Sequence, residues 1–142
     1  MEVQIYNKQN HLPIDSSWIK GIVQTVLERE GVACDEVIIH FVSKKKIADL
    51  HLQFFNDPSP TDCISFPMDQ PHGSIPISLL GEIFVCPQIA HEYVKKNGGE
   101  LRDEVALYII HGLLHLLGYD DLTAKCRKIM RSKEKELLGG CL

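Results

Sequence analysis

The stretch from Val105 to Leu117, VALYIIHGLLHLL, carries apolar residues on nearly every side of a helix. Such a pattern predicts a helix that is buried all around rather than one with a solvent-facing side. The run is shorter than the roughly 20 residues that a membrane-spanning helix needs, and it contains two histidines. We therefore predict the buried central helix of a globular core, and we expect no membrane span.

The two histidines in this run are four residues apart. His111 and His115 lie one turn apart on the same side of the predicted helix, where two imidazoles can share one ion. Gly118 lets the chain turn sharply, so Asp120 and Asp121 return carboxylates to the helix end. Two imidazole nitrogens and one carboxylate oxygen leave a fourth tetrahedral position for water, as in a catalytic zinc site. The spacing therefore predicts a metal site formed by His111, His115 and Asp121.

The same residues also have a purely structural interpretation. Two core histidines can each bind a backbone carbonyl, and Asp121 can cap the helix that follows. Gly112 stands where the common His-Glu-x-x-His protease motif carries its general base, which disfavours peptide hydrolysis by that route. A glycine inside a helix costs roughly 1 kcal/mol relative to alanine. We expect Gly112 to reflect either close approach by a strand or substrate, or tight helix packing.

The remaining sequence predicts four short strands and four further helices, from β-rich runs, helical spacing and capping residues. Strands are expected at Val3–Tyr6, Val37–Val42, Cys63–Phe66 and Leu80–Cys86. Helices are expected from a cap at Asp15 or Ser16 up to Gly31, then from Lys44 (capped by Ser43) to Phe55, at Pro87–Asn97, at Glu100–Leu117 for the central helix, and at Leu122–Leu138. Two prolines and a glycine between Met68 and Ser78 predict a mobile loop.

Composition limits the class of protein. The 142 residues, 44% hydrophobic and 24% charged, predict one folded domain over residues 1–142. A net charge of −4 excludes a generally basic surface, so any nucleic-acid contact must use a local patch. The N-terminus lacks the features of a secretory signal, and the five scattered cysteines contain no Cys-x-x-Cys pair. These features predict reduced thiols and a cytoplasmic location.

Four blocks of sequence occur in a recognisable order from about Leu50 onward. They are TDCISFP (Thr61–Pro67), LGEI (Leu80–Ile83), HGLLHLLGYD (His111–Asp120) and Met130-x3-Glu134. Together they resemble the YbeY family of bacterial rRNA-maturation endoribonucleases, whose signature is normally His-Gly-x-Leu-His-Leu-x-Gly-Tyr-Asp-His. The family's other blocks are Thr-Asp/Asn-Val-Leu-Ser-Phe-Pro and Leu-Gly-Asp-Ile.

The resemblance implies an α+β fold with a small mixed sheet of about four strands and about five helices, and a metal site at the C-terminal end of the long buried helix. It also implies a metal-dependent, single-strand-specific endoribonuclease that acts in 16S rRNA 3′ end processing and ribosome quality control. One Zn²⁺ per chain is expected, although another divalent metal is possible. The implied partners are single-stranded and ribosomal RNA and the ribosome or its associated proteins.

Three residues in the matched blocks are candidates to line the substrate groove: Asp62, Ser65 and Glu82. Capping and strand-end hydrogen bonding explain them equally well. The basic residues of the last predicted helix can follow an RNA backbone, although a solvated helix face is the simpler interpretation. They are Arg127, Lys128, Arg131, Lys133 and Lys135.

The chain departs from the family pattern at its third ligand. Asp121 stands where the family has its third metal histidine, while Asp120 matches the family's aspartate and can orient a ligand by a hydrogen bond without contacting the ion. A carboxylate neutralises part of the charge of an ion. We therefore expect a weaker electrophile than with three imidazoles, and competition from harder ions.

A second departure lies upstream of Thr61, where the family usually has an arginine thought to serve catalysis. Phe55 occupies that position and cannot stabilise charge on a phosphate. Core packing is its expected role, with stacking on a base as the alternative. Arg102 or the run Lys44–Lys46 can replace the arginine only if the fold brings them near.

Two rival functions remain open. The first is a ribosome-associated RNA-binding factor that keeps the metal and has weak or lost nuclease activity, as Phe55 and Asp121 allow. The second is a metal-dependent hydrolase acting on peptides, against which Gly112 argues.

Overall fold

The computed structural model describes residues 1–70 and 75–141. Its four strands form one sheet in the order β1-β2-β4-β3. They are β1 (Glu2–Asn7), β2 (Cys34–Phe41), β3 (Cys63–Pro67) and β4 (Ile77–Val85). Strands β1, β2 and β4 run parallel, and β3 runs antiparallel to β4. The predicted mixed sheet is confirmed.

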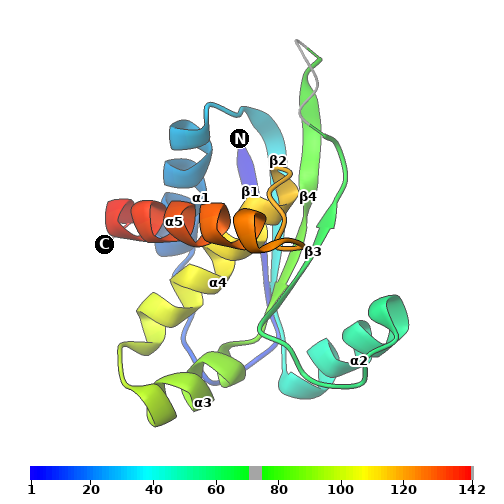
Figure 1. Cartoon of the computed structure of the whole chain (residues 1–142), viewed down its shortest axis with the longest axis vertical. Helices are drawn as coiled ribbons and strands as arrows, with labels where there is room; N and C mark the ends of the chain where they lie inside the picture. Colours follow the sequence, from blue (N-terminus) through cyan, green and yellow to red (C-terminus); the bar gives the residue numbers. More distant parts are fainter. Residues whose placement is uncertain (71–74, 142) are drawn as a thin grey trace.

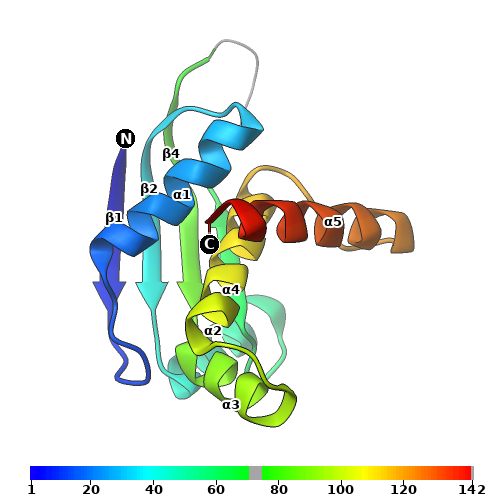
Figure 2. The same ribbon diagram turned by 90° about the vertical axis from the view of Figure 1, so that its left-hand side faces the viewer.

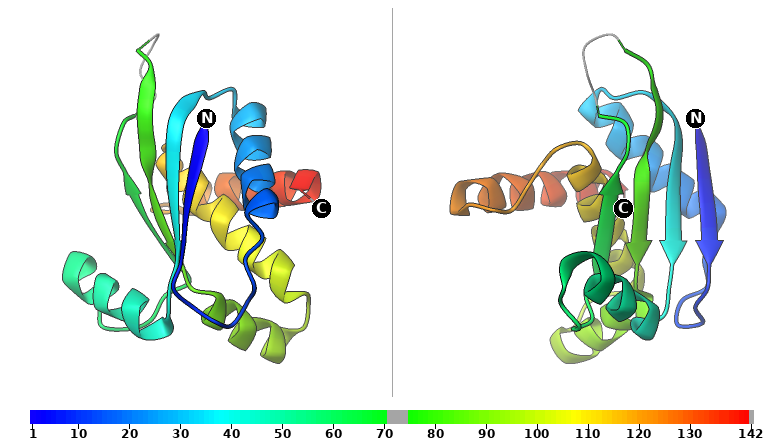
Figure 3. Two further views of the ribbon diagram at one scale, coloured as in Figure 1. Left: turned by 180° about the vertical axis from the view of Figure 1, so that it is seen from behind. Right: turned by 90° about the vertical axis from the view of Figure 1, so that its right-hand side faces the viewer.

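The described part of the chain contains five helices, as predicted. They are α1 (Ser16–Glu30), α2 (Lys44–Phe55), α3 (Pro87–Asn97), α4 (Leu101–Leu116) and α5 (Ala124–Cys141). Helices α1 and α4 cover one face of the sheet, and α5 lies across them as an outer layer (Figures 1 and 2). Helix α2 lies near one end of the opposite face, next to β3 (Figure 3). In residues 1–70 and 75–141, none of the helices has the length and apolar character needed to cross a membrane.

The predicted helix caps are present. The Asp15 carboxylate accepts a hydrogen bond from the Ser17 amide at 2.9 Å, and Gly31 ends α1 in the left-handed region with φ 67°. The Ser43 hydroxyl oxygen accepts from the Lys46 amide at the start of α2. These caps explain why α1 and α2 begin where the sequence predicts.

The expected loop between Met68 and Ser78 is partly wrong, because β4 begins at Ile77. The Met68 amide donates to the Leu80 carbonyl at 3.0 Å, so β3 and β4 remain paired beyond Pro67. Backbone pairing thus extends the hairpin into residues that the sequence assigns to a loop. Residues 71–74 of that segment lie outside the described residues.

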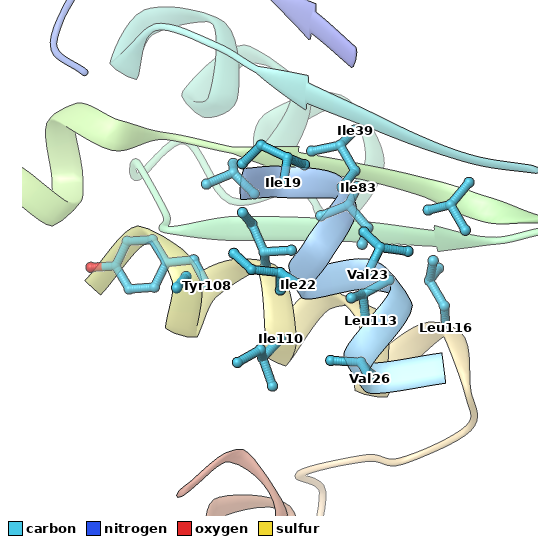
Figure 4. Packing of buried hydrophobic residues seen from close by; sticks show 14 of the residues in the cluster. Ile19, Ile22, Val23, Val26, Ile39, Ile83, Tyr108, Ile110, Leu113 and Leu116 are labelled. Carbon is cyan, nitrogen blue, oxygen red and sulfur yellow. The ribbon is translucent and has the colours of Figure 1, made fainter. Parts of the chain in front are cut away.

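Helix α4 is buried between the sheet on one side and α1 and α5 on the other (Figure 4). Side chains from α1 and the strands surround it, among them Ile19, Val23 and Ile83 (Figure 4). The prediction of a helix buried on nearly every side is confirmed. Its fully buried side chains include Val105, Ile109, Ile110, Leu113, Leu114 and Leu116.

Gly112 faces the sheet at a point where no side chain fits. A Cβ at this position would lie 2.7 Å from Ile83 Cγ2 and 2.9 Å from Cys63 Sγ. The Ser65 hydroxyl donates to the Gly112 carbonyl at 3.1 Å, which joins β3 to the same turn of α4. Of the explanations open for Gly112, close approach by strands accounts for the residue.

We expect Gly112→Ala to lower the free energy of unfolding by about 1–3 kcal/mol, because the new methyl group overpacks the contact with β3 and β4. Gly21→Ala is the matched control, since Gly21 is an exposed helical glycine with nothing within 4 Å of its Cβ position. That control should gain up to about 1 kcal/mol from helix propensity. Denaturant titration of both variants measures the difference, and equal effects would contradict the packing argument.

Candidate metal centre

The C-terminal end of α4 is closed by a Schellman turn. Gly118 adopts φ +100°, and its amide donates to the His115 carbonyl at 3.1 Å. The Tyr119 amide donates back to the Leu114 carbonyl at 3.0 Å. This turn places the Tyr119 carbonyl beside the His115 ring, whose Nδ1 donates to it at 3.0 Å. The backbone turn predicted at Gly118 therefore orients one of the candidate ligands.

The His111 ring is held by a residue of α5. Its Nδ1 donates to Glu134 Oε1 at 2.5 Å, and the Glu134 side chain is only 14% exposed. His111 and His115 are both half-buried, with ring centroids 4.6 Å apart and planes at 80°. Their Nε2 atoms are 3.0 Å apart. Both rings thus direct the same nitrogen to one point.

The two facing Nε2 atoms require a shared cation. A carbonyl and a carboxylate only accept hydrogen bonds, so the Nδ1 atoms of His111 and His115 both carry hydrogen. In two neutral rings, both Nε2 atoms are then acceptors facing each other. A cation between them satisfies both: a proton in the metal-free protein, or a divalent ion that has to displace that proton. Nδ1 bonded to a carboxylate or carbonyl is also the usual support of a metal-bound histidine.

The two imidazoles differ in basicity. Burial opposes the positive charge on His111, but the hydrogen bond and the charge of Glu134 outweigh it, so the pKa of His111 lies above its ordinary value. Burial and the neighbouring His111 hold the pKa of His115 below its ordinary value. His115 is therefore the ring that is neutral and ready to act as a ligand over the wider pH range.

Asp121 completes the cluster. Its Oδ2 lies 3.9 Å from His115 Nε2, and one ligand atom from each of His111, His115 and Asp121 lies within 4.8 Å of the others. Tetrahedral coordination with metal–nitrogen bonds of about 2.0–2.1 Å places two nitrogens roughly 3.3 Å apart. The observed 3.0 Å between the imidazoles fits such an ion with small side-chain adjustments. Over residues 1–70 and 75–141, no other three His, Cys, Asp or Glu side chains bring their ligand atoms so close together.

The neighbouring acidic and hydroxyl groups have other roles. Asp120 is exposed and accepts from the Leu122 amide at 3.1 Å, so it closes a turn next to the cluster. The Thr123 hydroxyl oxygen accepts from the Cys126 amide in the first turn of α5. Asp121 is therefore not the cap that the structural interpretation of the sequence required.

A cleft of about 550 Å³ opens beside the cluster. Its walls come from α2, from residues 61–65 at the start of β3, and from the end of α4. Asp62 and Ser65 line it, as expected of groove residues, although the Ser65 hydroxyl is already bonded to α4. Cys63 also lines it, but burial raises the pKa of its thiol, which disfavours a thiolate ligand or nucleophile there.

Two other candidate residues lie away from the cleft. Glu82 pairs with His40 Nε2 at 2.7 Å on the opposite face of the sheet, so it does not line the groove. The Arg102 guanidinium lies over the ring of Trp18, 4.4 Å from its centroid, at the start of α4. Thirteen residues of helix separate it from His115, a span of roughly 20 Å. Arg102 therefore does not replace the family arginine.

The lysine run at the start of α2 also lies outside the cleft. Lys44 pairs with Glu92 of α3 at 2.9 Å, and none of Lys44–Lys46 lines the cleft. The cleft wall is formed by the other end of the same helix. The run therefore does not supply the missing cation either.

Phe55 is not a core residue, so the expectation of core packing is wrong. Its side chain is 55% exposed and lines the cleft, next to His51 and Phe66. Helix α2 buries only Ile47 and Leu50, because its last turn extends beyond the sheet (Figure 3). The position at which the resemblance leads us to expect an arginine thus carries an aromatic ring beside the candidate metal ligands.

Glu134 is the site residue that the sequence does not assign to the site. The block Met130-x3-Glu134 contained the available signal, but only folding of α5 over α4 brings this carboxylate to His111. A partly buried polar contact fixes α5 there. Glu30 of α1 accepts from the Tyr119 hydroxyl at 2.5 Å and pairs with Lys133 at 3.3 Å.

The fold and the cluster define an α+β protein with a two-histidine, one-carboxylate cleft at the end of its central helix. The family model described as Endoribonuclease YbeY matches residues 4–141, and the chain belongs to this family. A relative from Protochlamydia amoebophila named Endoribonuclease YbeY is 48% identical over 90% of this chain and 85% of its own length. One of the same name from Chlamydia caviae is 41% identical over 97% and 89%. The solution structure of TM1509 from Thermotoga maritima superposes with a TM-score of 0.67 at 26% identity, covering 99% of this chain and 89% of that one.

We expect Glu134→Gln to weaken divalent metal binding by about 10–100-fold, because the His111 ring loses the carboxylate that orients it. Competition with a chromogenic chelator, using Zn²⁺ as the probe ion, measures the affinity. Glu136→Gln removes the same charge from an exposed position of α5 and should leave the affinity unchanged. Equal weakening by both variants would show a general charge effect instead.

Proposed function

We propose that this protein is a metal-dependent endoribonuclease that cleaves single-stranded RNA. The observation that carries the proposal is the pair of His111 and His115 Nε2 atoms, 3.0 Å apart at the edge of a cleft and close to the Asp121 carboxylate. The name shared by the relatives supports the reaction class. We further propose one domain over residues 1–142, a cytoplasmic location and a role in 16S rRNA 3′ end processing and ribosome quality control, with the ribosome or its associated proteins as partners.

Zinc is the proposed ion, held by His111, His115 and Asp121. Two imidazoles and one carboxylate suit zinc and leave a position open. When bound there, a divalent ion would activate a water molecule or polarise a phosphate oxygen. Because Asp121 brings a negative charge where the family has an imidazole, a harder ion such as Mn²⁺ is the expected competitor.

The chain's own residues prepare this chemistry. Glu134 and the Tyr119 carbonyl fix which nitrogen of each imidazole faces the cleft. Asp62 lies in the cleft wall and adds negative potential beside the imidazoles, which favours a cation there. Phe55 offers an exposed ring on which a base of single-stranded RNA can stack. In single-stranded RNA the bases are unpaired and therefore free for such stacking contacts.

The third ligand can be tested by metal content. Protein dialysed against metal-free buffer after loading should retain one ion per chain in the parent and in Asp120→Ala, and should lose most of it in Asp121→Ala. The reason is that only Asp121 has a carboxylate oxygen among the cluster's ligand atoms. Elemental analysis gives the stoichiometry. Retention of the ion in Asp121→Ala would show that another residue supplies the third ligand.

Cleavage of a labelled single-stranded RNA tests the activity. We expect zinc-dependent cleavage by the parent and a loss of at least about 100-fold in His115→Ala, because one of two imidazole ligands is removed. His91→Ala is the control, since His91 is exposed on α3 away from the cleft. RNA binding without cleavage by the parent would favour the binding factor, which the aromatic Phe55 in place of an arginine supports. Casein digestion sensitive to chelation would favour the peptide hydrolase.

A further inference from the structure

A second, smaller hollow lies against the candidate metal ligands on the side of α5. It measures about 150 Å³ and is lined by residues of α4, of the turn after it and of α5. His111 and Asp121 line both this hollow and the larger cleft. The cluster therefore has two different surroundings: an aromatic wall from α2 on one side and a wall from α5 on the other.

The wall from α5 carries two guanidinium groups. Arg127 and Arg131 are one helical turn apart, so they project from the same side of α5, and both line the hollow with His111 and Asp121. Lys128 and Lys135 are exposed on the same helix but line neither the hollow nor the cleft. Arg127 and Arg131 are thus the cationic residues of α5 that line the hollow.

The arginines differ in how they are engaged. Arg127 Nη1 donates to the Asp121 backbone carbonyl at 3.2 Å, which ties this side chain to the turn that carries the third ligand. Arg131 forms no hydrogen bond or ion pair with any residue in the described ranges 1–70 and 75–141. Glu134, one of the two carboxylates that line the hollow, is bonded to His111. The Arg131 guanidinium therefore keeps its donors available beside the cluster.

The charges of the hollow suit an anion once a divalent ion is bound. Asp121 and Glu134 are the carboxylates that line it, and the ion balances their charge. The two guanidinium groups then leave the hollow positive. A guanidinium matches the paired oxygens of a phosphate with two parallel hydrogen bonds. In a chain of net charge −4, such a local group of cations is what RNA binding requires.

We propose that Arg127 and Arg131 form a phosphate-binding site beside the His111–His115–Asp121 cluster and contact the phosphate of RNA that lies nearest the metal. The proposal rests on the proposed function and assigns to α5 the cation that Phe55 does not supply on α2. Arg131 contacts the phosphate and can use all its N–H donors for it, because they bind no other group of the described residues. Arg127 contacts it while also holding the Asp121 turn.

Binding of single-stranded RNA as a function of salt tests this site without relying on cleavage. A fluorescein-labelled 16-nucleotide RNA made of 2′-O-methyl nucleotides, which resist cleavage, is titrated with zinc-loaded protein at several KCl concentrations, and anisotropy gives the affinity. Arg127→Gln/Arg131→Gln should bind about tenfold or more weakly, because charge-assisted hydrogen bonds are lost. The slope of log affinity against log salt should fall by about 1.4, or about 0.7 for each lost phosphate contact.

Lys128→Gln/Lys135→Gln is the matched control, with the same change in net charge on the same helix. It should change the affinity less than about threefold and the slope by less than about 0.7. Arg131→Gln alone should lower the slope by about 0.7 and leave zinc affinity unchanged, which separates phosphate binding from support of Asp121. Thermal unfolding of each variant verifies that the fold is retained.

The outcomes separate the two proposals. Equal loss of affinity in both double variants, no loss in either, or no RNA binding by the parent would overturn the phosphate site. Arginine-dependent binding by a parent that cleaves no RNA would support the site while the nuclease proposal fails. Cleavage that is unchanged in Arg127→Gln/Arg131→Gln would support the nuclease and overturn the site.

Discussion

Two imidazoles at the end of a buried helix have four ring nitrogens, and the protein supplies acceptors for only two of them. The Nδ1 atoms of His111 and His115 are bonded to Glu134 and to the Tyr119 carbonyl, which leaves both Nε2 atoms facing each other. Such a pair is stable only around a shared cation. Helix α5 takes part in this arrangement, because its Glu134 fixes the His111 ring.

The rest of the fold holds this pair in place. Gly112 lets β3 and β4 approach α4 so closely that an added methyl group would overlap their side chains, and the Ser65 hydroxyl joins β3 to the same turn. On the other side, Glu30 fixes the Tyr119 hydroxyl and Lys133 and thereby holds the turn and α5 together. The site therefore lies at the junction of the sheet, the central helix α4 and the outer helix α5, and these packed elements hold its residues in place.

The structure gives the two sides of the cluster different chemistry. The wall of the cleft formed by α2 is aromatic because Phe55 is exposed there. The cations lie instead on α5, where Arg127 and Arg131 line the hollow behind His111. A nucleic acid strand crossing the cluster would then meet a ring suited to a base on one side and guanidinium groups suited to a phosphate on the other. The Asp121 carboxylate would reduce the positive charge that a bound ion presents to a phosphate. The guanidinium groups of Arg127 and Arg131 add positive charge beside it.

The sequence by itself determined the central helix, the two histidines on one face of it, the turn at Gly118 and the caps at Asp15 and Ser43. These features depend on residues within a few positions of one another, so local spacing and capping chemistry are enough to predict them. Tertiary structure alone decided that Glu134 supports His111, that Arg102 and Glu82 lie away from the cleft, that Phe55 is exposed and that Arg131 lines a hollow with His111 and Asp121. Those outcomes depend on how α2 and α5 pack against the sheet and α4, and contacts between segments distant in sequence leave no periodic pattern along the chain.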